Sequence, residues 1–281
     1  MSERREKHTN YSEELGDIDL SLSPHALHLF SRVVGFDVTA PVTEEQIQRS
    51  QRWIHGSHKR LFEKSLCHLI GFLGGRALAK LGESTIRRID GFDGLVTIEV
   101  GFLGSDGPVM HPEIKIRTMV PDASQLLVSP FEHSSFIGEN GRGDPRVLNS
   151  RIARLMRRTA FDEIPQIVYQ VPEGKLAVVG TRGYTRPELA GTQILVQMAR
   201  DSMLDLSTDA RALLDTYQAK VDRYAPIPGL TSLFQATTVK GTTHLSRMYG
   251  DVAYWERATP LVDLRIALIS AKQRAKGVGV W

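Results

Sequence analysis

Cysteine is almost absent from this sequence, and long hydrophobic runs are absent altogether. Cys67 is the only cysteine among 281 residues, which excludes an internal disulfide and an all-cysteine metal site. No 18 consecutive residues are apolar, so a helix that crosses a membrane completely is not expected. The polar first residues do not resemble a secretory signal. A reducing compartment fits these features without being required by them.

A large excess of charge of either sign is missing too. The chain has 35 Lys and Arg against 32 Asp and Glu, a formal net charge of +3, which is small for a dedicated nucleic-acid-binding protein. Hydrophobic residues make up 41% of the chain, so most of it should fold, into one or two domains. The sequence has no internal repeat and no low-complexity tract. These features favour a folded protein and do not favour a nucleic-acid partner.

The most informative stretch, residues 157–166, contains two adjacent carboxylates, Asp162 and Glu163. Thr159 or Asp162 can cap a helix here, with Pro165 in its first turn, where the missing N–H costs little. A helix start offers free N–H groups and a positive dipole end, which suit phosphate. A carboxylate at this place can hold Mg²⁺ or attack phosphorus. The alternative is an acidic helix N-terminus without a catalytic role, which the dipole favours in any protein.

Residues 59–81 combine an apolar helical stripe with basic flanks. Residues 65–75 carry no charge, and glycines at 71, 74 and 75 soften the middle. The stripe consists of Leu66, Leu69, Ile70, Leu73, Ala77 and Leu81. The pattern alone is typical of a core helix. The alternative is a helix that lies in, or dips into, one membrane leaflet, with its basic residues at the headgroups.

Residues 90–120 are predicted to form β structure, because apolar and polar residues alternate at 96–100 and at 114–117. The residues between these runs, 104–108, have the composition of a turn. The alternation places Lys115 and Arg117 on one face, where they can form a two-pronged clamp for phosphate. A solvated polar face of the strand explains the same pattern equally well.

Further cations follow in the sequence. Six arginines fall within residues 142–158, and a helix there would put Arg151, Arg154 and Arg158 on one face. Such a cluster can bind phosphate or an acidic headgroup, although a solvated face is the usual explanation. Arg182 follows a predicted strand at 175–180, at the carboxyl end, where α/β proteins place ligand contacts.

The remaining segments are predicted from local patterns. A helix begins near Thr43, where Thr43 and Gln46 have the spacing of a capping box. Residues 122–145 have the composition of a long loop, an apolar stripe over 210–224 predicts a core helix, and a last helix is predicted over 261–275.

These segments together resemble the bacterial sugar transferases, the monotopic phosphoglycosyl transferases that start exopolysaccharide, O-antigen and glycoprotein glycan assembly. The resemblance extends from the region of residue 59 to residue 268, with the motifs in the family's order. The motif at 157–166 is complete. The other motifs are Lys59-Arg60-Leu61-Phe62, Lys115-Ile116-Arg117-Thr118-Met119, Asp144-Pro145-Arg146, Pro228-Gly229-Leu230-Thr231 with Gln235, Asp251 with Tyr254, and Asp263-Leu264-Arg265-Ile266.

The chain also departs from the family pattern. Residues 99–101 only echo the family's Gln-Glu-Arg-Val-Gly and lack its arginine, and residues 180–183 keep the arginine of Gly-Pro-Arg-Pro but lose both prolines. The apolar helix lacks the family's proline, so Gly74 and Gly75 are expected to bend it instead. We see no amino-terminal transmembrane bundle, which matches the short, catalytic-domain form of the family.

The resemblance implies an α/β fold with a small mixed sheet, surrounding helices and an amphipathic or re-entrant membrane-associated helix at 59–81. The composition of the first residues predicts a polar N-terminal arm that, with the first helix, covers 1–50, and a catalytic domain of the family's kind is expected over 51–281, including the membrane-associated helix. The resemblance further implies a monotopic or peripheral protein on the cytoplasmic face of the inner membrane, and it leaves a homodimer open.

The resemblance also implies a reaction. A nucleotide diphosphate-sugar donates its sugar 1-phosphate to a polyprenyl phosphate in the inner leaflet, with Mg²⁺ or Mn²⁺ as cofactor. Asp162 is then the nucleophile that forms an aspartyl-phosphosugar intermediate, and Glu163 is the metal ligand. Such a transfer needs charge neutralisation and in-line placement. The residues expected to bind the phosphates are Lys115, Arg117, Arg158 and Arg182.

Two other classes of function stay open on the sequence. A catalytically impaired homologue could act as a binding or assembly partner in glycan synthesis; the altered loop at Arg182 favours this reading and the intact Asp162–Glu163 pair opposes it. A nucleic-acid-binding protein would explain the arginine cluster and would bind with steep salt dependence, but it leaves the ordered motifs unexplained.

Overall fold

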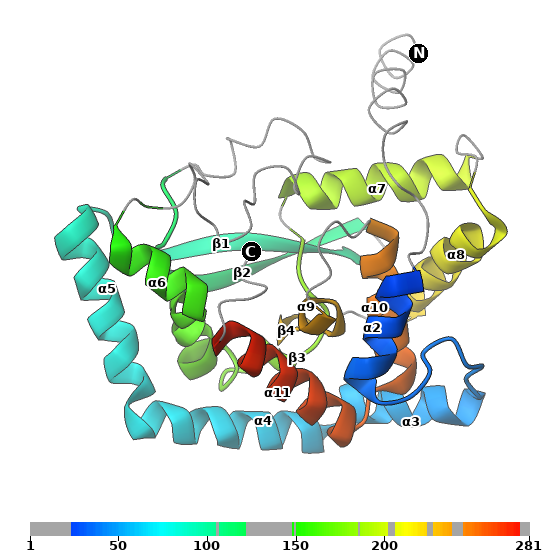
Figure 1. Cartoon of the computed structure of the whole chain (residues 1–281), viewed down its shortest axis with the longest axis horizontal. Helices are drawn as coiled ribbons and strands as arrows, with labels where there is room; N and C mark the ends of the chain where they lie inside the picture. Colours follow the sequence, from blue (N-terminus) through cyan, green and yellow to red (C-terminus); the bar gives the residue numbers. More distant parts are fainter. Residues whose placement is uncertain are drawn as a thin grey trace, which may run out of the picture.

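The computed structural model describes residues 24–104, 107–121, 148, 150–184, 186–201, 206–223, 227–237 and 244–275. Its strands form two two-stranded sheets, β1 with β2 and β3 with β4, and helices surround them (Figure 1). The predicted α/β class is confirmed, although parallel and antiparallel pairs occur in separate sheets and not in one mixed sheet. The predicted loop at 122–145 and the motif at 144–146 lie outside the described residues.

Two helices form within the segment predicted as a polar arm with a first helix. α2 spans Pro24–Val34 and buries Phe30 in the main core, where it packs against the C-terminal helices. α3 spans Glu44–Ile54 and begins with the predicted capping box, in which Gln46 N donates to Thr43 Oγ1 at 3.3 Å and Thr43 N donates to Gln46 Oε1 at 2.8 Å. Both helices therefore belong to the packed fold.

The apolar segment forms a corner between two helices. α4 spans Ser57–Ile70, a single π-helical turn η1 spans Gly71–Gly75, and α5 spans Arg76–Asp90. The bend predicted at Gly74 and Gly75 is confirmed, because Gly74 has φ 113° and interrupts the helical backbone. A Cβ atom added at Gly74 would meet nothing within 4 Å, so the backbone conformation, and not lack of space, requires glycine there.

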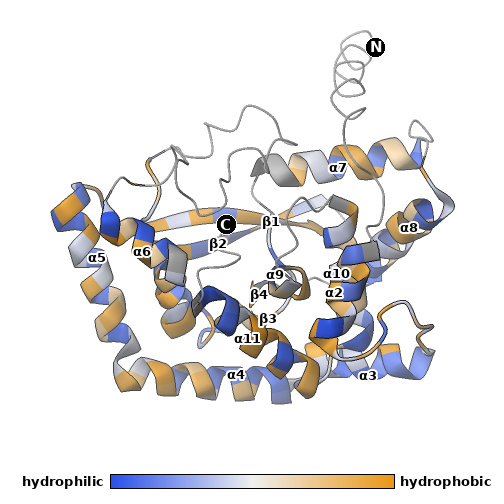
Figure 2. Ribbon diagram, in the orientation of Figure 1, coloured by the Kyte–Doolittle hydropathy of each residue, from blue (hydrophilic) through white to orange (hydrophobic). Residues whose placement is uncertain are grey.

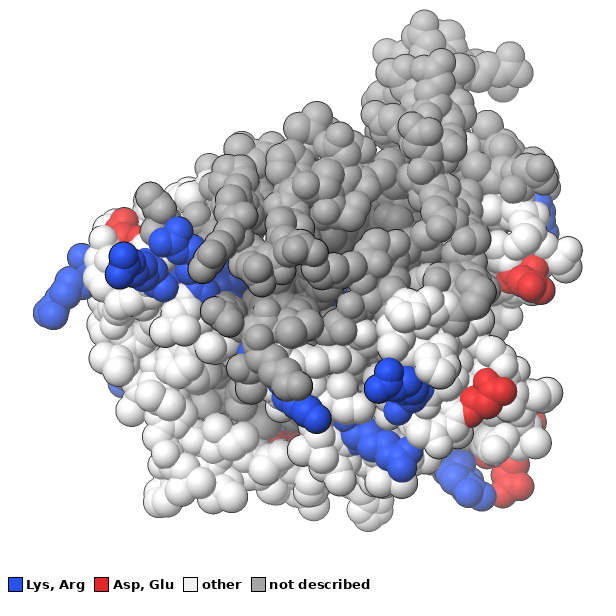
Figure 3. Space-filling model, viewed as in Figure 1, with Lys and Arg blue, Asp and Glu red and all other residues white. Residues whose placement is uncertain are grey.

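The stripe of apolar residues on this corner is exposed. The exposed residues of this stripe are Leu66, Leu69, Ile70, Leu73 and Leu81. The side chain of the nearby Phe72 is 88% exposed. The core-helix interpretation is therefore wrong for this stripe. Figure 2 shows hydrophobic colouring on α4, most of it toward α5, and the corner where α4 meets α5 is uncharged on the face that Figure 3 shows. In the described part of the chain, no helix has the length and apolar character needed to span a membrane.

The predicted β structure is a hairpin. β1, Leu95–Gly104, pairs antiparallel with β2, Gly107–Ile116, from Leu95 opposite Ile116 to Gly104 opposite Gly107. Gly101 at the centre of β1 also exchanges backbone hydrogen bonds with Tyr184, which ties the hairpin to the loop that carries Arg182.

The second sheet joins distant parts of the sequence. β3, Ala177–Val179, pairs parallel with β4, Gly229–Thr231, and the intervening chain contains α7, Arg186–Arg200, and α8, Thr208–Arg223. A Cβ atom at Gly229 would lie 2.2 Å from the backbone nitrogen of Gly180, so this close approach requires glycine. The glycine of the Pro-Gly-Leu-Thr motif is thus explained by packing.

Three helices complete the fold: α9, Leu233–Thr237, α10, His244–Arg257, and α11, Pro260–Ala275. The predicted last helix, 261–275, is confirmed. The predicted stripe of α8 is buried at Ala210, Leu213, Leu214, Tyr217 and Val221, where it packs in the main core with residues of α2, α9, α10 and α11.

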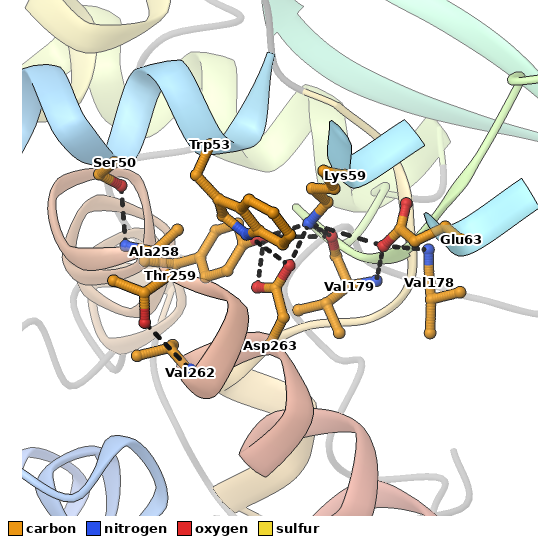
Figure 4. Close-up of polar contacts among 11 residues, drawn as sticks. Ser50, Trp53, Lys59, Glu63, Val178, Val179, Ala258, Thr259, Val262 and Asp263 are labelled. Carbon is orange, nitrogen blue, oxygen red and sulfur yellow. Dashed lines mark hydrogen bonds and ion pairs between the residues drawn. The ribbon is translucent and has the colours of Figure 1, made fainter. Parts of the chain in front are cut away.

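A buried polar cluster fastens α4 to the rest of the protein (Figure 4). Lys59 Nζ donates to the Val179 carbonyl and to Tyr254 Oη, each at 2.7 Å, and to Asp263 Oδ2 at 2.5 Å. Glu63 accepts from the backbone of β3, with Val178 N at 3.1 Å. Three of the motifs that carry the family resemblance therefore supply structural contacts, which hold α4 against β3, α10 and α11.

Candidate active site

The carboxylate pair sits at a sharp change of direction. α6, Arg151–Thr159, ends at Ala160, whose φ of 53° is left-handed, and the short 3₁₀ helix η4, Phe161–Glu163, follows. The helical path continues through Pro165, whose φ of −56° is helical, into the π-helical turn η5, Gln166–Gln170. This reversal brings the pair against β2.

The predicted caps are wrong. Thr159 Oγ1 donates back to the Leu155 carbonyl at 2.9 Å, within its own helix, and Asp162 accepts a hydrogen bond from Thr118. No side chain caps η4. Asp162 and Glu163 are therefore positioned by residues that are distant in the sequence, and they do not lie at the start of a capped helix.

Glu163 lies between two cations from different parts of the chain. Its Oε1 accepts from Lys115 Nζ at 3.3 Å, and its Oε2 lies 2.6 Å from Arg274 Nη1. Burial by itself would raise the pKa of Glu163, but Arg274 and Lys115 outweigh that effect and hold the pKa below its usual value. Glu163 is therefore ionised at neutral pH, as a metal ligand must be.

Asp162 is in the opposite electrostatic situation. The side chain is buried, and Thr118 Oγ1 donates a hydrogen bond to its Oδ2 at 3.2 Å. Burial, and next the charge of Glu163, raise the pKa of Asp162 to about 6, although Lys115 and Arg157 oppose this. Oδ1 accepts no hydrogen bond from the described residues. Two adjacent carboxyl groups thus have different environments, which allows them different chemical roles.

Lys115 is fixed between two carboxylates. Its Nζ lies 3.3 Å from Glu113 Oε2 as well as 3.3 Å from Glu163 Oε1. Glu113 in turn accepts from Gln166 Nε2 at 2.8 Å, and Gln170 clamps the β2 backbone through Ile114 N and the Pro112 carbonyl. Burial by itself would lower the pKa of Lys115. The charges of Glu163 and Glu113 outweigh burial and raise this pKa above its usual value, so the amine keeps its positive charge.

Arg182 lies in the loop after β3, as the sequence predicted. Arg247 Nη2 donates to the carbonyl oxygens of Arg182 and Gly183 at 2.9 and 2.7 Å, and its guanidinium lies 3.6 Å from the ring centre of Tyr184. Arg247 thus braces the loop that lacks the family's two prolines. The charge of Arg182 reaches the carboxylate pair, since it adds to the lowering of the Glu163 pKa after Arg274 and Lys115.

One of the predicted phosphate ligands, Arg117, contacts another part of the fold, and the structure does not test another, Arg158. Arg117 Nε donates to the Asp93 carbonyl at 3.0 Å, at the connection between α5 and β1, so the predicted clamp with Lys115 does not form at Glu163. Arg158 belongs to α6, but its side chain lies outside the described part of the structure. Phosphate binding by either residue stays a prediction.

Sequence reasoning missed several residues of the site. Thr118 stood within a recognised motif, and Gln166 closed another, but neither was assigned a contact. Glu113 follows the same alternation as Lys115 and could have been found from it. Arg274 belongs to the basic end of the last helix, and only the fold brings it to Glu163.

A divalent cation fits the carboxylate pair when substrate supplies the other ligands. In the ranges that the structure describes, no group of three or more His, Cys, Asp or Glu side chains could hold a metal by itself. Mg²⁺ is usually bound by one or two carboxylates together with substrate phosphates. Glu163, ionised and adjacent to Asp162, provides such a carboxylate.

Comparison with protein families and curated proteins assigns the chain. The family model for bacterial sugar transferases matches residues 104–277, which include the hairpin strand β2, the Asp162–Glu163 pair and Arg274. An exopolysaccharide production protein, PSS, of Rhizobium leguminosarum bv. phaseoli is 28% identical over 195 residues, which cover 62% of this chain and 83% of that protein.

Two other relatives are much longer proteins. Galactosyl transferase CpsE of Streptococcus agalactiae is 27% identical over 59% of this chain, but the match covers only 31% of CpsE. Undecaprenyl-phosphate glucose phosphotransferase of Komagataeibacter xylinus is 36% identical over 29% of this chain and 13% of its own length. On the family match and these relatives, the chain belongs to the bacterial sugar transferase family and is a transferase.

Proposed function

We propose that the protein transfers a sugar 1-phosphate from a nucleotide diphosphate-sugar to a polyprenyl phosphate, as the first step of exopolysaccharide or capsule synthesis. The names of the three relatives support this class of reaction, since they refer to exopolysaccharide production, galactosyl transfer and glucose phosphotransfer to undecaprenyl phosphate. The observation that carries the proposal is the pairing of a buried Asp162 with an ionised Glu163 between Lys115 and Arg274.

In the first step, an oxygen of the Asp162 carboxylate attacks the phosphorus that bears the sugar. The bond from this phosphorus to the bridging oxygen breaks, and nucleoside monophosphate leaves with the electron pair. Oδ1 is the oxygen available for attack, because Thr118 holds Oδ2. Burial away from water leaves the nucleophile poorly solvated and therefore reactive. Lys115 and Arg182 offset the negative charge of the diphosphate.

In the second step, an oxygen of the polyprenyl phosphate attacks the same phosphorus. The acyl–phosphate bond breaks, the Asp162 carboxylate is regenerated, and the lipid leaves as a polyprenyl diphosphate-sugar. Both steps require charge neutralisation more than proton transfer. A metal ion bound with Glu163 would supply positive charge to the diphosphate oxygens.

The lipid acceptor requires contact with a membrane. We propose that the exposed corner of α4, η1 and α5 inserts into the cytoplasmic leaflet without crossing it, which places the protein at the cytoplasmic face of the inner membrane. Phe72 and Leu73 at the bend are 88% and 73% exposed, and apolar side chains in this number are stabilised by contact with acyl chains.

The proposed function is tested by nucleotide release. Purified protein is incubated with a panel of nucleotide diphosphate-sugars, with and without polyprenyl phosphate in detergent. We expect sustained release of nucleoside monophosphate with one donor only when the lipid is present. A protein that binds a donor but releases nothing from any of them would act as an assembly partner, and the proposed reaction would be rejected.

A further inference from the structure

Arg274 belongs to none of the recognised motifs, and the proposed reaction gives it no role, although it lies in the candidate active site. It lies in the last turn of α11, and its Nη1 is 2.6 Å from Glu163 Oε2. Its Nη2 donates to the Leu230 carbonyl of β4 at 3.1 Å. The guanidinium group therefore bridges the carboxylate pair and the strand that carries the Pro-Gly-Leu-Thr motif.

The contact between Arg274 and Glu163 is close but is not an aligned hydrogen bond. Glu163 Oε2 is buried and, among the described residues, accepts no hydrogen bond of good geometry despite the short distance to Arg274. The interaction is therefore mainly an attraction between charges, without the aligned N–H bonds of a bidentate pair. An attraction of this kind can be exchanged for another cation at the same oxygen.

A divalent cation bound directly to Oε2 would take the place that Arg274 holds. Mg²⁺ binds carboxylate oxygen at about 2.0–2.1 Å, and a guanidinium nitrogen lies 2.6 Å from the same atom, so the two cations would repel each other strongly. Lys115 would keep a carboxylate partner when a metal binds Glu163, because Glu113 contacts it as well. Within the ranges that the structure describes, the other contact of Arg274 is a hydrogen bond to the neutral carbonyl of Leu230.

We propose that Arg274 and the divalent cation compete for Glu163, and that the displaced guanidinium binds the diphosphate of the donor. The binding of the donor diphosphate rests on the proposed function, whereas the competition for Glu163 does not. Arg274 is a suitable phosphate ligand because its planar group presents several N–H donors in a fixed geometry. The exchange also keeps the charge balanced, since three carboxylates, Asp162, Glu163 and Glu113, surround the site before an anionic donor arrives.

The competition is tested with Mn²⁺ alone, in the full-length protein and without donor. Binding is followed by the electron paramagnetic resonance signal of free Mn²⁺. Arg274→Gln should bind Mn²⁺ about tenfold more tightly than the parent, within the range of typical couplings between two ligands. Arg274→Lys, which keeps the charge, should stay close to the parent. Lys272→Gln is the matched control, since Lys272 is exposed on the same helix end, and it should have no effect.

Either of two results would overturn this half of the proposal. One is Mn²⁺ affinity in Arg274→Gln that equals or falls below that of the parent. The other is a parent protein that does not bind Mn²⁺ saturably, or whose saturable Mn²⁺ binding is still present in Glu163→Gln. Far-ultraviolet circular dichroism tests whether each variant is folded. If Arg274→Gln is not folded, the Mn²⁺ affinity of Arg274→Lys is compared with that of the parent instead.

The donor half is tested with inorganic pyrophosphate at saturating Mg²⁺, by calorimetry. Arg274→Gln should bind pyrophosphate about tenfold more weakly, so one substitution changes metal and pyrophosphate affinity in opposite directions. Equal pyrophosphate affinity in variant and parent means that Arg274 does not bind the diphosphate. Nucleotide release by the parent protein is measured separately, so failure of the proposed reaction is distinguished from failure of the exchange.

Discussion

Lys59 Nζ and Asp263 Oδ2 form a buried ion pair at 2.5 Å, although 204 residues separate them in the sequence. Tyr254 completes the cluster, because its hydroxyl group contacts Lys59 and donates to Asp263 Oδ1 at 2.9 Å. The pair joins the start of the exposed apolar helix α4 to α11, the helix that carries Arg274. The apolar corner and the active site thus share one anchor.

The first prediction is that this anchor contributes strongly to stability. Lys59→Met leaves Asp263 and Glu63 buried without their cation, which should lower the free energy of unfolding by about 3–5 kcal/mol. Urea unfolding in detergent measures the free energy of unfolding of the parent and the variant. The control is Arg49→Met, which removes an exposed ion pair with Glu45 and should cost less than about 0.5 kcal/mol. Equal effects of the two substitutions would mean that the buried cluster is not an anchor.

The second prediction concerns the pH dependence of the reaction. Asp162 must be ionised to attack phosphorus, and burial and the charge of Glu163 raise its pKa to about 6. Activity should therefore be lost as pH falls through about 6 and be constant above pH 7. Thr118→Val removes a hydrogen bond that lowers this pKa, so it should move the midpoint to higher pH. An identical midpoint in parent and variant would show that another group controls the profile.

The third prediction tests the nucleophile. With the donor alone, the parent should release nucleoside monophosphate in an amount no larger than the enzyme present, and the sugar phosphate should stay on Asp162 as a hydroxylamine-labile acyl phosphate. Asp162→Asn should abolish both. It should also raise the free energy of unfolding at pH 7, by roughly 1–3 kcal/mol, because a raised pKa in the folded state means that the ionised form opposes folding above the unfolded pKa. Transfer at the parent rate by Asp162→Asn would remove the proposed mechanism.

The fourth prediction concerns the metal. Activity should disappear in EDTA and return with Mg²⁺ or Mn²⁺. Glu163→Gln keeps the shape of the side chain but removes the charge, so it should lose most activity while the protein remains folded. Full turnover in EDTA would exclude Glu163 as a metal ligand.

The fifth prediction is that the corner of α4 and α5 binds membranes. Leu73→Asp places a charge where an apolar side chain is 73% exposed, so flotation with anionic liposomes should fall by about tenfold, as expected from the transfer free energy of one large apolar residue. Val109→Asp, at an exposed position of β2, is the control and should float like the parent. A parent protein that stays monomeric in plain buffer and ignores liposomes would contradict the membrane proposal.

Features set by near neighbours were predictable from the sequence. The capping box at Thr43 depends on two residues of one helical turn, and the hairpin at 95–116 depends on alternation and a short turn. Lys115 could be selected from the strand alternation that pairs it with Arg117, and the same alternation places the missed Glu113 on its face. In each case the interaction is local, so the sequence contains the whole pattern.

Features set by distant partners were not predictable. α2 lies in the segment predicted as a polar arm, and whether its apolar residues are buried depends on α9 and α11. Glu163 and Arg274 meet only because α11 packs near η4, and no spacing in the sequence indicates it. The apolar stripe at 66–81 was visible, but whether protein covers it depends on the remainder of the fold. Arg117 follows the strand alternation, yet its guanidinium turns to the Asp93 carbonyl after β2 ends.

The position of Arg274 has a consequence for how the protein is made. α11 follows every other described helix and strand, whereas the exposed corner at Gly74 lies before the hairpin. A ribosome therefore finishes the apolar corner long before it adds the residue that neutralises Glu163, and the Lys59 anchor also waits for Asp263. During translation the nascent chain has its apolar segment while the candidate site is still incomplete, so the proposed contact with a bilayer can precede the proposed chemistry within each newly made molecule.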